Sequence, residues 1–241
     1  MLKKGSVIYE PKGRAGEYAP MAVNLYRGCE HGCVYCYAPK VIFIDRQDFL
    51  KASPRKNIIQ KLRKDAPQVD IAGDVLLCFT CDPYQPIDTE YKLTRQAIEI
   101  LHDSNLNVTI LTKGGKRAER DFDLLTPNDS LAVTLTFLDE KPSLKWEPGA
   151  AIPEERIESL KKAHDLGIKT WVSLEPVIDP DVSIEIIRQT HTFVDLYKVG
   201  KINYHSIEKS IDWSKFLKNV KAVLEEHGCQ YYIKKDLMVY G

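Results

Sequence analysis

The sequence predicts an α/β fold built on a mainly parallel β-sheet. Apolar, β-branched stretches alternate six times with charged stretches of helical spacing, a pattern typical of βαβ units. The chain has 241 residues, of which 44% are hydrophobic, so it can bury one large core. Six such units fit a partial (β/α)6, TIM-like barrel as well as a doubly wound sheet, and periodicity alone does not choose between them.

The expected elements follow one another in chain order. Strands are predicted at residues 22–27, 75–80, 107–112, 131–136, 169–174 and 196–199. Helices are predicted at residues 57–64, 91–103, 118–125, 153–165 and 182–189. Pro153 suits the first turn of its helix, and Gly167 suits the exit from it.

We expect one domain over residues 1–241, with an N-terminal leader at 1–21, a barrel core at 22–205 and a C-terminal helix and tail at 206–241. The last helix should begin near Asp212 and end at Gly228, and residues 230–233 form a candidate final strand. One face of that helix should pack on the core, because apolar residues recur there at helical spacing. These residues are Trp213, Phe216, Leu217, Val220 and Leu224.

Composition narrows the setting in which the protein works. The 34 basic and 34 acidic side chains cancel, so no global charge attracts nucleic acid or an acidic membrane. We find neither an apolar run suited to a signal peptide nor a membrane-spanning stretch. Six cysteines are too few for a disulfide scaffold, so we expect a cytoplasmic protein with metal-binding or catalytic thiols.

Reactive side chains follow most of the predicted strands. The carboxyl ends of parallel strands carry the chemistry of α/β folds. Four of the six strand-end sets combine titratable or thiol groups with glycine or proline, which is more typical of a site than of plain turns. The sets are residues 29–36, 81–84, 113–115, 137–140, 175–176 and 200–204.

The first of these sets contains Cys29, Cys33 and Cys36, in the stretch NLYRGCEHGCVYCYAPK. Thiolates select zinc, copper(I) or iron–sulfur clusters. Gly28 and Gly32 permit positive φ angles, so the loop can wrap around a bulky group.

Three cysteines leave the ligand set one short. A structural zinc ion needs four ligands, and a complete iron–sulfur cluster usually takes four cysteines. His31, Cys78 and Cys81 are candidates for the fourth ligand. Alternatively, the metal keeps one open position that binds a substrate or cofactor.

The motif Cys29-x-x-x-Cys33-x-Tyr35-Cys36 resembles the cluster loop of radical S-adenosylmethionine (SAM) enzymes. The resemblance implies a partial (β/α)6 barrel in which these cysteines hold a [4Fe–4S] cluster and SAM chelates the fourth iron. One electron then cleaves SAM to methionine and a 5′-deoxyadenosyl radical, which abstracts hydrogen from the substrate. An external electron donor of the flavodoxin or ferredoxin type is implied as a partner.

Residues 24–179 are similar to the spore photoproduct lyase group, also described as DNA repair photolyase-like. The similarity rests on residues 27–37, Thr80-Cys81-Asp82, Thr112-Lys113 and Glu147-Pro148-Gly149. The resemblance implies that Tyr35, Tyr37, Thr80, Cys81, Asp82, Lys113, Thr134 and Arg156 contact SAM or line its pocket. We assign Tyr37 and Cys81 to catalysis, Thr134 to the ribose and Arg156 to the SAM carboxylate.

The sequence departs from that group at its hydrogen-donor cysteine, whose place is taken by Phe79. Side chains alternate across a strand, so Cys78 should face the opposite side and behave as an inert buried residue, whereas Cys81 should lie near the site. This departure argues against direct transfer of the lyase reaction, and lyase-like or other radical chemistry stays open.

We expect a radical SAM enzyme with no membrane partner and with nucleic acid as one possible substrate. Two alternatives are a zinc-binding nucleic-acid-interaction module and a redox protein whose closed cluster has Cys81 as the fourth ligand. The glycines of Lys113-Gly114-Gly115 invite close approach of a ligand. Candidates for substrate contact are Tyr84, Gln85, Asp139, Glu140, Glu175, Lys198, Asn203, Tyr204, Tyr231 and Tyr232.

Overall fold

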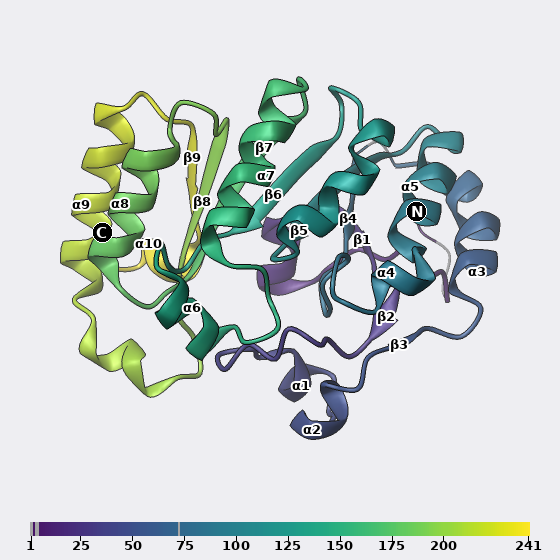
Figure 1. Cartoon of the computed structure of the whole chain (residues 1–241), viewed down its shortest axis with the longest axis horizontal. Helices are drawn as coiled ribbons and strands as arrows, with labels where there is room; N and C mark the ends of the chain where they lie inside the picture. Colours follow the sequence, from purple (N-terminus) through teal and green to yellow (C-terminus); the bar gives the residue numbers. More distant parts are fainter. Residues whose placement is uncertain (1, 3–4, 72) are drawn as a thin grey trace.

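The computed structural model describes residues 2, 5–71 and 73–241, and its centre is a seven-stranded parallel sheet (Figure 1). The strands lie side by side in chain order, with β1 and β9 at the two edges. They are β1 (Met21–Val23), β4 (Asp74–Leu77), β5 (Asn107–Thr112), β6 (Ser130–Thr134), β7 (Lys169–Val177), β8 (Leu196–Lys201) and β9 (Tyr231–Ile233). The prediction of a partial (β/α)6 barrel is confirmed, and the candidate final strand pairs with β8 in parallel as a seventh.

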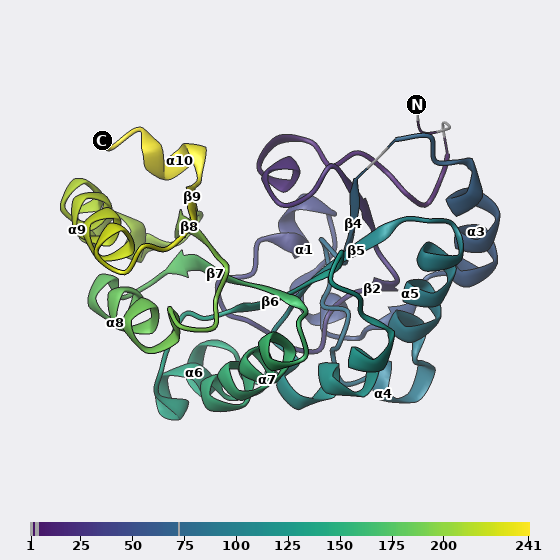
Figure 2. The same ribbon diagram turned by 90° about the horizontal axis from the view of Figure 1, so that it is seen from above.

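Most of the longer helices pack outside the sheet, where Figure 2 shows them along its convex side. The α-helices are α1 (Ala38–Val41), α2 (Arg46–Phe49), α3 (Ile58–Asp65), α4 (Asp88–Tyr91), α5 (Leu93–Asp103), α6 (Glu140–Trp146), α7 (Pro153–Asp165), α8 (Pro180–Thr190), α9 (Trp213–Glu226) and α10 (Lys235–Met238). The 3-10 helices are η1 (Gly13–Glu17), η2 (Ala66–Gln68), η3 (Gly115–Leu124) and η4 (Ser206–Ser210). A small antiparallel sheet joins β2 (Tyr26–Arg27) to β3 (Ser53–Pro54). Within the described part of the chain, no helix has the length and apolar character needed to cross a bilayer.

The first predicted strand is interrupted at Asn24. Its side-chain oxygen accepts hydrogen bonds from the backbone N–H groups of Phe79 and Thr80, at 2.9 and 2.7 Å. Because the Asn24 side chain, and not the backbone ladder, binds the end of β4, the chain leaves the large sheet after β1 and pairs elsewhere as β2.

The predicted helix at 118–125 is a 3-10 segment, η3, which begins earlier, at Gly115. Arginine side chains from η3 bind neighbouring backbone carbonyls: Arg117 Nε lies 2.7 Å from the carbonyl oxygen of Tyr84, and Arg120 Nη1 lies 2.8 Å from that of Asp88. These contacts fix the segment by tertiary interactions that helical periodicity does not encode.

The core forms between the sheet and the outer helices. The strands carry β-branched and aliphatic residues that are almost fully buried on both faces, as expected for a parallel sheet covered on both sides. The apolar face predicted for the last helix is also buried, from Trp213 to Leu224. The carboxyl ends of the strands therefore meet around one interior space.

The predicted leader closes the open side of this barrel. In Figure 2 the purple η1 segment lies between the strands of the N-terminal half and the yellow C-terminal strand. Lys198 on β8 donates a hydrogen bond to the carbonyl oxygen of Tyr18 at 2.9 Å, and Tyr232 on β9 donates one to Glu17 at 2.9 Å. Side chains from the first 18 residues thus become part of the interior.

Candidate active site

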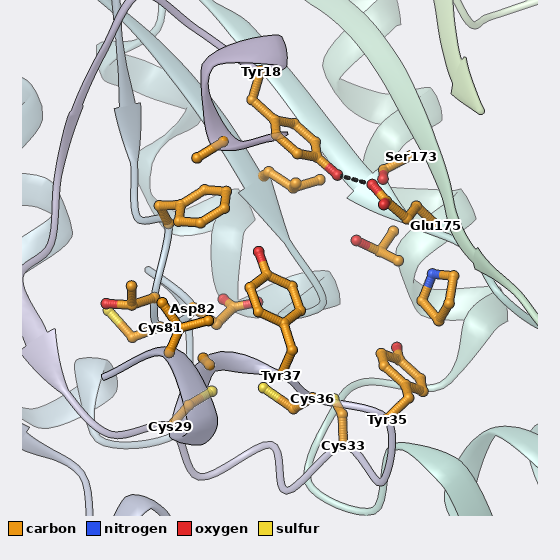
Figure 3. A pocket seen from close by; sticks show the side chains of 18 of the residues that line it. Tyr18, Cys29, Cys33, Tyr35, Cys36, Tyr37, Cys81, Asp82, Ser173 and Glu175 are labelled. Carbon is orange, nitrogen blue, oxygen red and sulfur yellow. Dashed lines mark hydrogen bonds between the residues drawn. The ribbon is translucent and has the colours of Figure 1, made fainter. Parts of the chain in front are cut away.

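A cavity of about 440 Å³ lies inside the barrel at the carboxyl ends of the strands. Figure 3 shows Cys29, Cys33 and Cys36 at one end, with Tyr18 and Glu175 at the other. Its walls come from the cysteine loop, η1 and residues that follow the strands. The cavity is thus the place where the strand-end residues converge.

The cysteine loop is held by backbone hydrogen bonds on both sides. Cys29 N–H donates to the carbonyl oxygen of Phe49 at 2.8 Å, and Gly149 N–H donates to that of His31 at 2.9 Å. Gly28 has a φ of +85°, and a Cβ atom there would lie 2.5 Å from the Phe49 oxygen, so only glycine fits. The loop is therefore anchored to the neighbouring backbone on both sides.

The three thiols lie at the floor of the cavity, largely removed from water. Burial raises the pKa of Cys29 well above its usual range, and burial raises the pKa of Cys33 to about 12. The pKa of Cys36 is also raised by burial. These thiols are protonated at neutral pH, so a metal that binds them must displace protons.

His31, a candidate fourth ligand, is already engaged through both ring nitrogens. Its Nδ1 lies 3.4 Å from Asp82 Oδ2, and its Nε2 lies 3.1 Å from Arg117 Nη2. Among the described residues, no three Cys, His, Asp or Glu side chains are grouped closely enough to hold one metal ion. His31 would have to give up these two contacts to serve as a fourth ligand.

Asp82 connects the ends of β4 and β5. Its carboxylate accepts hydrogen bonds from the Thr112 hydroxyl at 2.6 Å and from the Lys113 backbone N–H at 2.8 Å. Burial by itself raises the pKa of Asp82, but His31 and these hydrogen bonds hold it well below the usual range. Asp82 therefore stays ionised, and it sets the position of the chain at Lys113.

Cys78 and Cys81 both line the cavity. The predicted opposite orientation of Cys78 is wrong, because β4 ends at Leu77 and strand alternation no longer holds beyond it. Cys78 Sγ accepts a hydrogen bond from the Leu25 N–H at 3.4 Å, and burial together with a hydrogen bond to Cys81 raises the pKa of Cys78.

A buried chain of polar groups lies behind Lys113. Lys113 Nζ is 5.7 Å from the centre of the Tyr35 ring, and the Tyr35 hydroxyl donates a hydrogen bond to Glu147. Glu147 in turn forms an ion pair with Arg156. Arg156 is fully buried and does not line the cavity, so the predicted direct contact with the SAM carboxylate is not supported by this geometry.

The glycines after Lys113 have a packing role, which corrects the expectation of close ligand approach. A Cβ atom on Gly114 would lie 2.6 Å from the Tyr84 Cβ, and one on Gly115 would lie 2.6 Å from the Ala151 Cβ. They allow the end of β5 to pack closely against its neighbours.

The structure brings all the other predicted site residues to the cavity. They are Cys29, Cys33, Tyr35, Cys36, Tyr37, Thr80, Cys81, Asp82, Lys113 and Thr134.

The candidates for substrate contact divide into two groups. Glu175, Asn203 and Tyr204 line the cavity. The remaining candidates do not: Tyr84, Gln85, Asp139, Glu140, Lys198, Tyr231 and Tyr232. The Gln85 side chain instead accepts a hydrogen bond from the Glu30 N–H at 2.9 Å and so supports the cysteine loop.

Sequence reasoning missed Tyr18 and Lys234, which line the cavity from outside the predicted core. Lys234 directly follows β9, so the strand-end rule finds it once that strand is known. Tyr18 carries no such signal, because it lies before the first strand.

Comparison with known proteins identifies the family. The model of the radical SAM superfamily matches residues 23–194. An uncharacterized protein of Methanocaldococcus jannaschii is 30% identical over 188 residues, which cover 77% of this chain and 71% of that protein. A radical SAM Nalpha-GlyT isomerase of Pseudomonas phage M6 is 28% identical over 192 residues, covering 76% of this chain and 38% of that protein.

Solved structures of radical SAM enzymes share the fold. Spore photoproduct lyase complexed with dinucleoside spore photoproduct has a TM-score of 0.71 at 14% identity, covering 96% of this chain and 80% of that one. Streptococcus suis SuiB bound to S-adenosylmethionine has a TM-score of 0.65 at 13% identity, covering 91% and 51%. With the superfamily model matching most of its length, the chain belongs to the radical SAM superfamily and is an enzyme.

Proposed function

We propose that this enzyme holds a [4Fe–4S] cluster through Cys29, Cys33 and Cys36 and cleaves SAM reductively to a 5′-deoxyadenosyl radical. The radical abstracts hydrogen from a substrate bound in the same cavity. The proposal rests on one observation: the cysteine loop places three thiols together at the floor of a cavity of about 440 Å³.

The donor set fits this cluster. Three thiolates leave one iron without a protein ligand, which is the iron available to SAM, and both nitrogens of nearby His31 are engaged elsewhere. When bound, the cluster supplies the electron that breaks a carbon–sulfur bond of SAM. The protein's own residues bind, orient and shield the reactants.

Cavity-lining residues have distinct proposed roles toward SAM. Lys113 lines the cavity with its ammonium 5.7 Å from the Tyr35 ring and suits the SAM carboxylate. Arg156 acts only indirectly, by fixing Glu147. Tyr35 and Tyr37 flank the cluster, Thr80, Cys81 and Asp82 border the methionyl end, and Thr134 suits the ribose. Tyr37 and Cys81 are the candidates for returning a hydrogen atom to the product radical.

We further propose an external flavodoxin- or ferredoxin-type electron donor and a nucleic-acid lesion or base as the substrate class. The fold is similar to that of a lyase solved with a dinucleoside. Residues 27–56, which include the cysteine loop, also carry six basic against three acidic side chains, although the whole chain has no net charge. A local positive field of this kind favours a phosphate backbone.

Anaerobic reconstitution with iron and sulfide tests the cluster. After reduction with dithionite, we expect an EPR signal that shifts when SAM is added, together with release of 5′-deoxyadenosine. Replacing Cys29, Cys33 or Cys36 by serine should abolish iron binding, whereas Cys229→Ser, remote from the cavity, should retain about four irons per chain.

The other outcomes decide between the alternatives. An EPR signal that does not shift when SAM is added, and that is lost in the Cys81→Ser variant, would identify a closed redox cluster. Zinc without iron would contradict the proposal and indicate a structural metal site.

A further inference from the structure

A second polar cluster lies at the end of the cavity away from the cysteines (Figure 3). The Tyr18 hydroxyl donates a hydrogen bond to Glu175 Oε2, and Lys234 Nζ lies 2.6 Å from that same oxygen. The Lys234 ammonium also lies 3.8 Å from the centre of the Tyr18 ring. These three side chains come from the residue after η1, from β7 and from the residue after β9, and none of the roles proposed toward SAM uses them.

The cluster is closely built. The Lys234 side chain is 1% exposed and that of Glu175 is 17% exposed, so the carboxylate is the part that faces the cavity. A Cβ atom on Gly200 would lie 2.8 Å from both the Glu175 Cδ and the Lys234 Cδ, which leaves room only for glycine. A buried ion pair is weak evidence for stability, since well-packed apolar residues often replace one without loss. Ligand binding is a better reason for these groups.

The charges around the cluster balance. Lys234 offsets Glu175, and Lys198 donates its hydrogen bonds to the backbone carbonyls of Glu17 and Tyr18. The Glu17 carboxylate accepts hydrogen bonds from Tyr232 and from the Lys235 N–H, with its other oxygen 4.0 Å from Lys234. Because Lys234 already neutralises Glu175, the cluster offers no net charge to a ligand, so an uncharged group fits best.

Aromatic rings connect this end of the cavity to the cysteine end. The Phe79 ring contacts both tyrosines: its centre lies 6.1 Å from that of Tyr18 and 6.3 Å from that of Tyr37. Leu76 and Leu111 add apolar surface to the same cavity. Such a wall favours a flat ring, which can stack on aromatic faces.

We propose that Tyr18, Glu175 and Lys234 form the subsite that recognises the substrate, and that it binds an uncharged planar ring bearing an N–H group. Both Tyr18 and Lys234 contact Glu175 Oε2, while Oε1 makes no hydrogen bond to any residue that the structure describes. The ring N–H donates to this second oxygen, and the ring lies against the aromatic wall. This inference rests on the proposed function, because the substrate must share the cavity with SAM.

Small probes test the subsite on the reconstituted enzyme by saturation-transfer NMR titration. Uracil should bind, and 1,3-dimethyluracil, which keeps the ring but lacks both N–H groups, should bind about tenfold more weakly or not at all. N-acetylglycinamide, an amide without a ring, should bind more weakly than uracil. Equal binding of uracil and its dimethyl form, or preference for the open-chain amide, would overturn the proposal.

Variants assign the binding to these residues. Tyr18→Phe removes the hydroxyl that holds Glu175, and Glu175→Gln removes the charged acceptor; each should weaken uracil binding about tenfold. Tyr231→Phe is the matched control, because its hydroxyl binds Glu225 on the outer surface. A Glu175→Gln/Lys234→Met variant removes both charges and so leaves no unpaired buried charge. If this variant binds uracil more weakly but keeps the thermal unfolding curve of the wild type, a folding defect is excluded as the cause. Unchanged binding in all three cluster variants would refute the assignment.

Measurements with SAM distinguish a failure of this inference from a failure of the proposed function. Saturating SAM should leave uracil binding intact, whereas competition would assign the subsite to the adenine of SAM and overturn the inference. Wild-type enzyme that releases 5′-deoxyadenosine but binds no uracil contradicts the subsite alone. Enzyme that binds uracil but does not cleave SAM contradicts the proposed function alone.

Discussion

Arg156 Nη2 lies 2.6 Å from Glu147 Oε2, and the two side chains are 1% and 0% exposed. The other Glu147 oxygen accepts the hydrogen bond of Tyr35, the residue directly before Cys36. Burial raises the pKa of Glu147, but Arg156 and Lys113 lower it overall, so the group remains a carboxylate. Helix α7 is thereby connected to the cysteine loop through one buried ion pair.

Removing one member of this pair should be strongly destabilising. Arg156→Met leaves the Glu147 charge buried without its partner, and we expect a loss of about 3–5 kcal/mol in the free energy of unfolding. Urea denaturation measures it. The double variant Glu147→Gln/Arg156→Met, which removes both charges of the pair, should lose less than the single variant. Equal losses would show that the ion pair itself is unimportant.

Lys113 should contribute to SAM binding without holding the cluster. Its ammonium is buried at the cavity, and although burial lowers its pKa, Cys33 and Glu147 raise it overall. Lys113→Met should weaken SAM binding roughly 10- to 100-fold, the range for a hydrogen bond to a charged group, with iron content unchanged. Equilibrium dialysis with labelled SAM measures the affinity. Lys116→Met, whose exposed ammonium pairs with Glu158, is the control; a similar loss in both variants would contradict a specific contact.

Gly149 should be essential for the shape of the cysteine loop. A Cβ atom there would approach the Glu30 carbonyl oxygen far inside van der Waals contact. We expect Gly149→Ala to cost about 1–3 kcal/mol from overpacking and to lower the iron content after reconstitution. In Gly228→Ala, no atom of the described residues lies within 4 Å of the new Cβ. The only cost is then the left-handed backbone at φ +64°, ~1 kcal/mol, and the iron content should stay full. Thermal unfolding and iron analysis test both variants, and full iron content in Gly149→Ala would disprove the packing argument.

Lys198 should make the free energy of unfolding depend on pH in the alkaline range. Burial, and then repulsion from Lys234, lower the pKa of Lys198 from 10.5 to about 8 in the folded state. Between pH 8 and 10.5 the unfolded chain therefore binds more protons, so this group makes stability rise with pH across that window. Below pH 8 the Lys198 ammonium is charged in both the folded and the unfolded chain, so the full cost of burying that charge lowers the free energy of unfolding.

Denaturation of wild type and Lys198→Met at pH 7.5 and pH 10 measures this effect. The variant should show a smaller gain, or a larger loss, than wild type between the two pH values. Lys218→Met, on the exposed face of α9, should follow wild type. Parallel curves for wild type and Lys198→Met would exclude the shift.

Much of the candidate site followed from strand ends. Thr80, Asp82, Lys113 and Glu175 lie at or just after the ends of three predicted strands, and all line one cavity. This works because parallel neighbouring strands bring their carboxyl ends to one edge of the sheet, whatever the details of side-chain packing. The orientation of Cys78 was wrong because it depends on where β4 ends, and strand limits are the least certain part of such a prediction.

The sequence by itself determined the alternation of strands and helices, the three-cysteine loop and its likeness to radical SAM enzymes. These features are local, since spacing along the chain fixes which side chains share a face or a loop. Only the tertiary structure decided that Arg156 is buried behind the cavity and that Tyr18 meets Glu175, 157 residues further along the chain. The reason is physical: contact across the open side of the barrel depends on the curvature of the whole sheet, which no local spacing encodes.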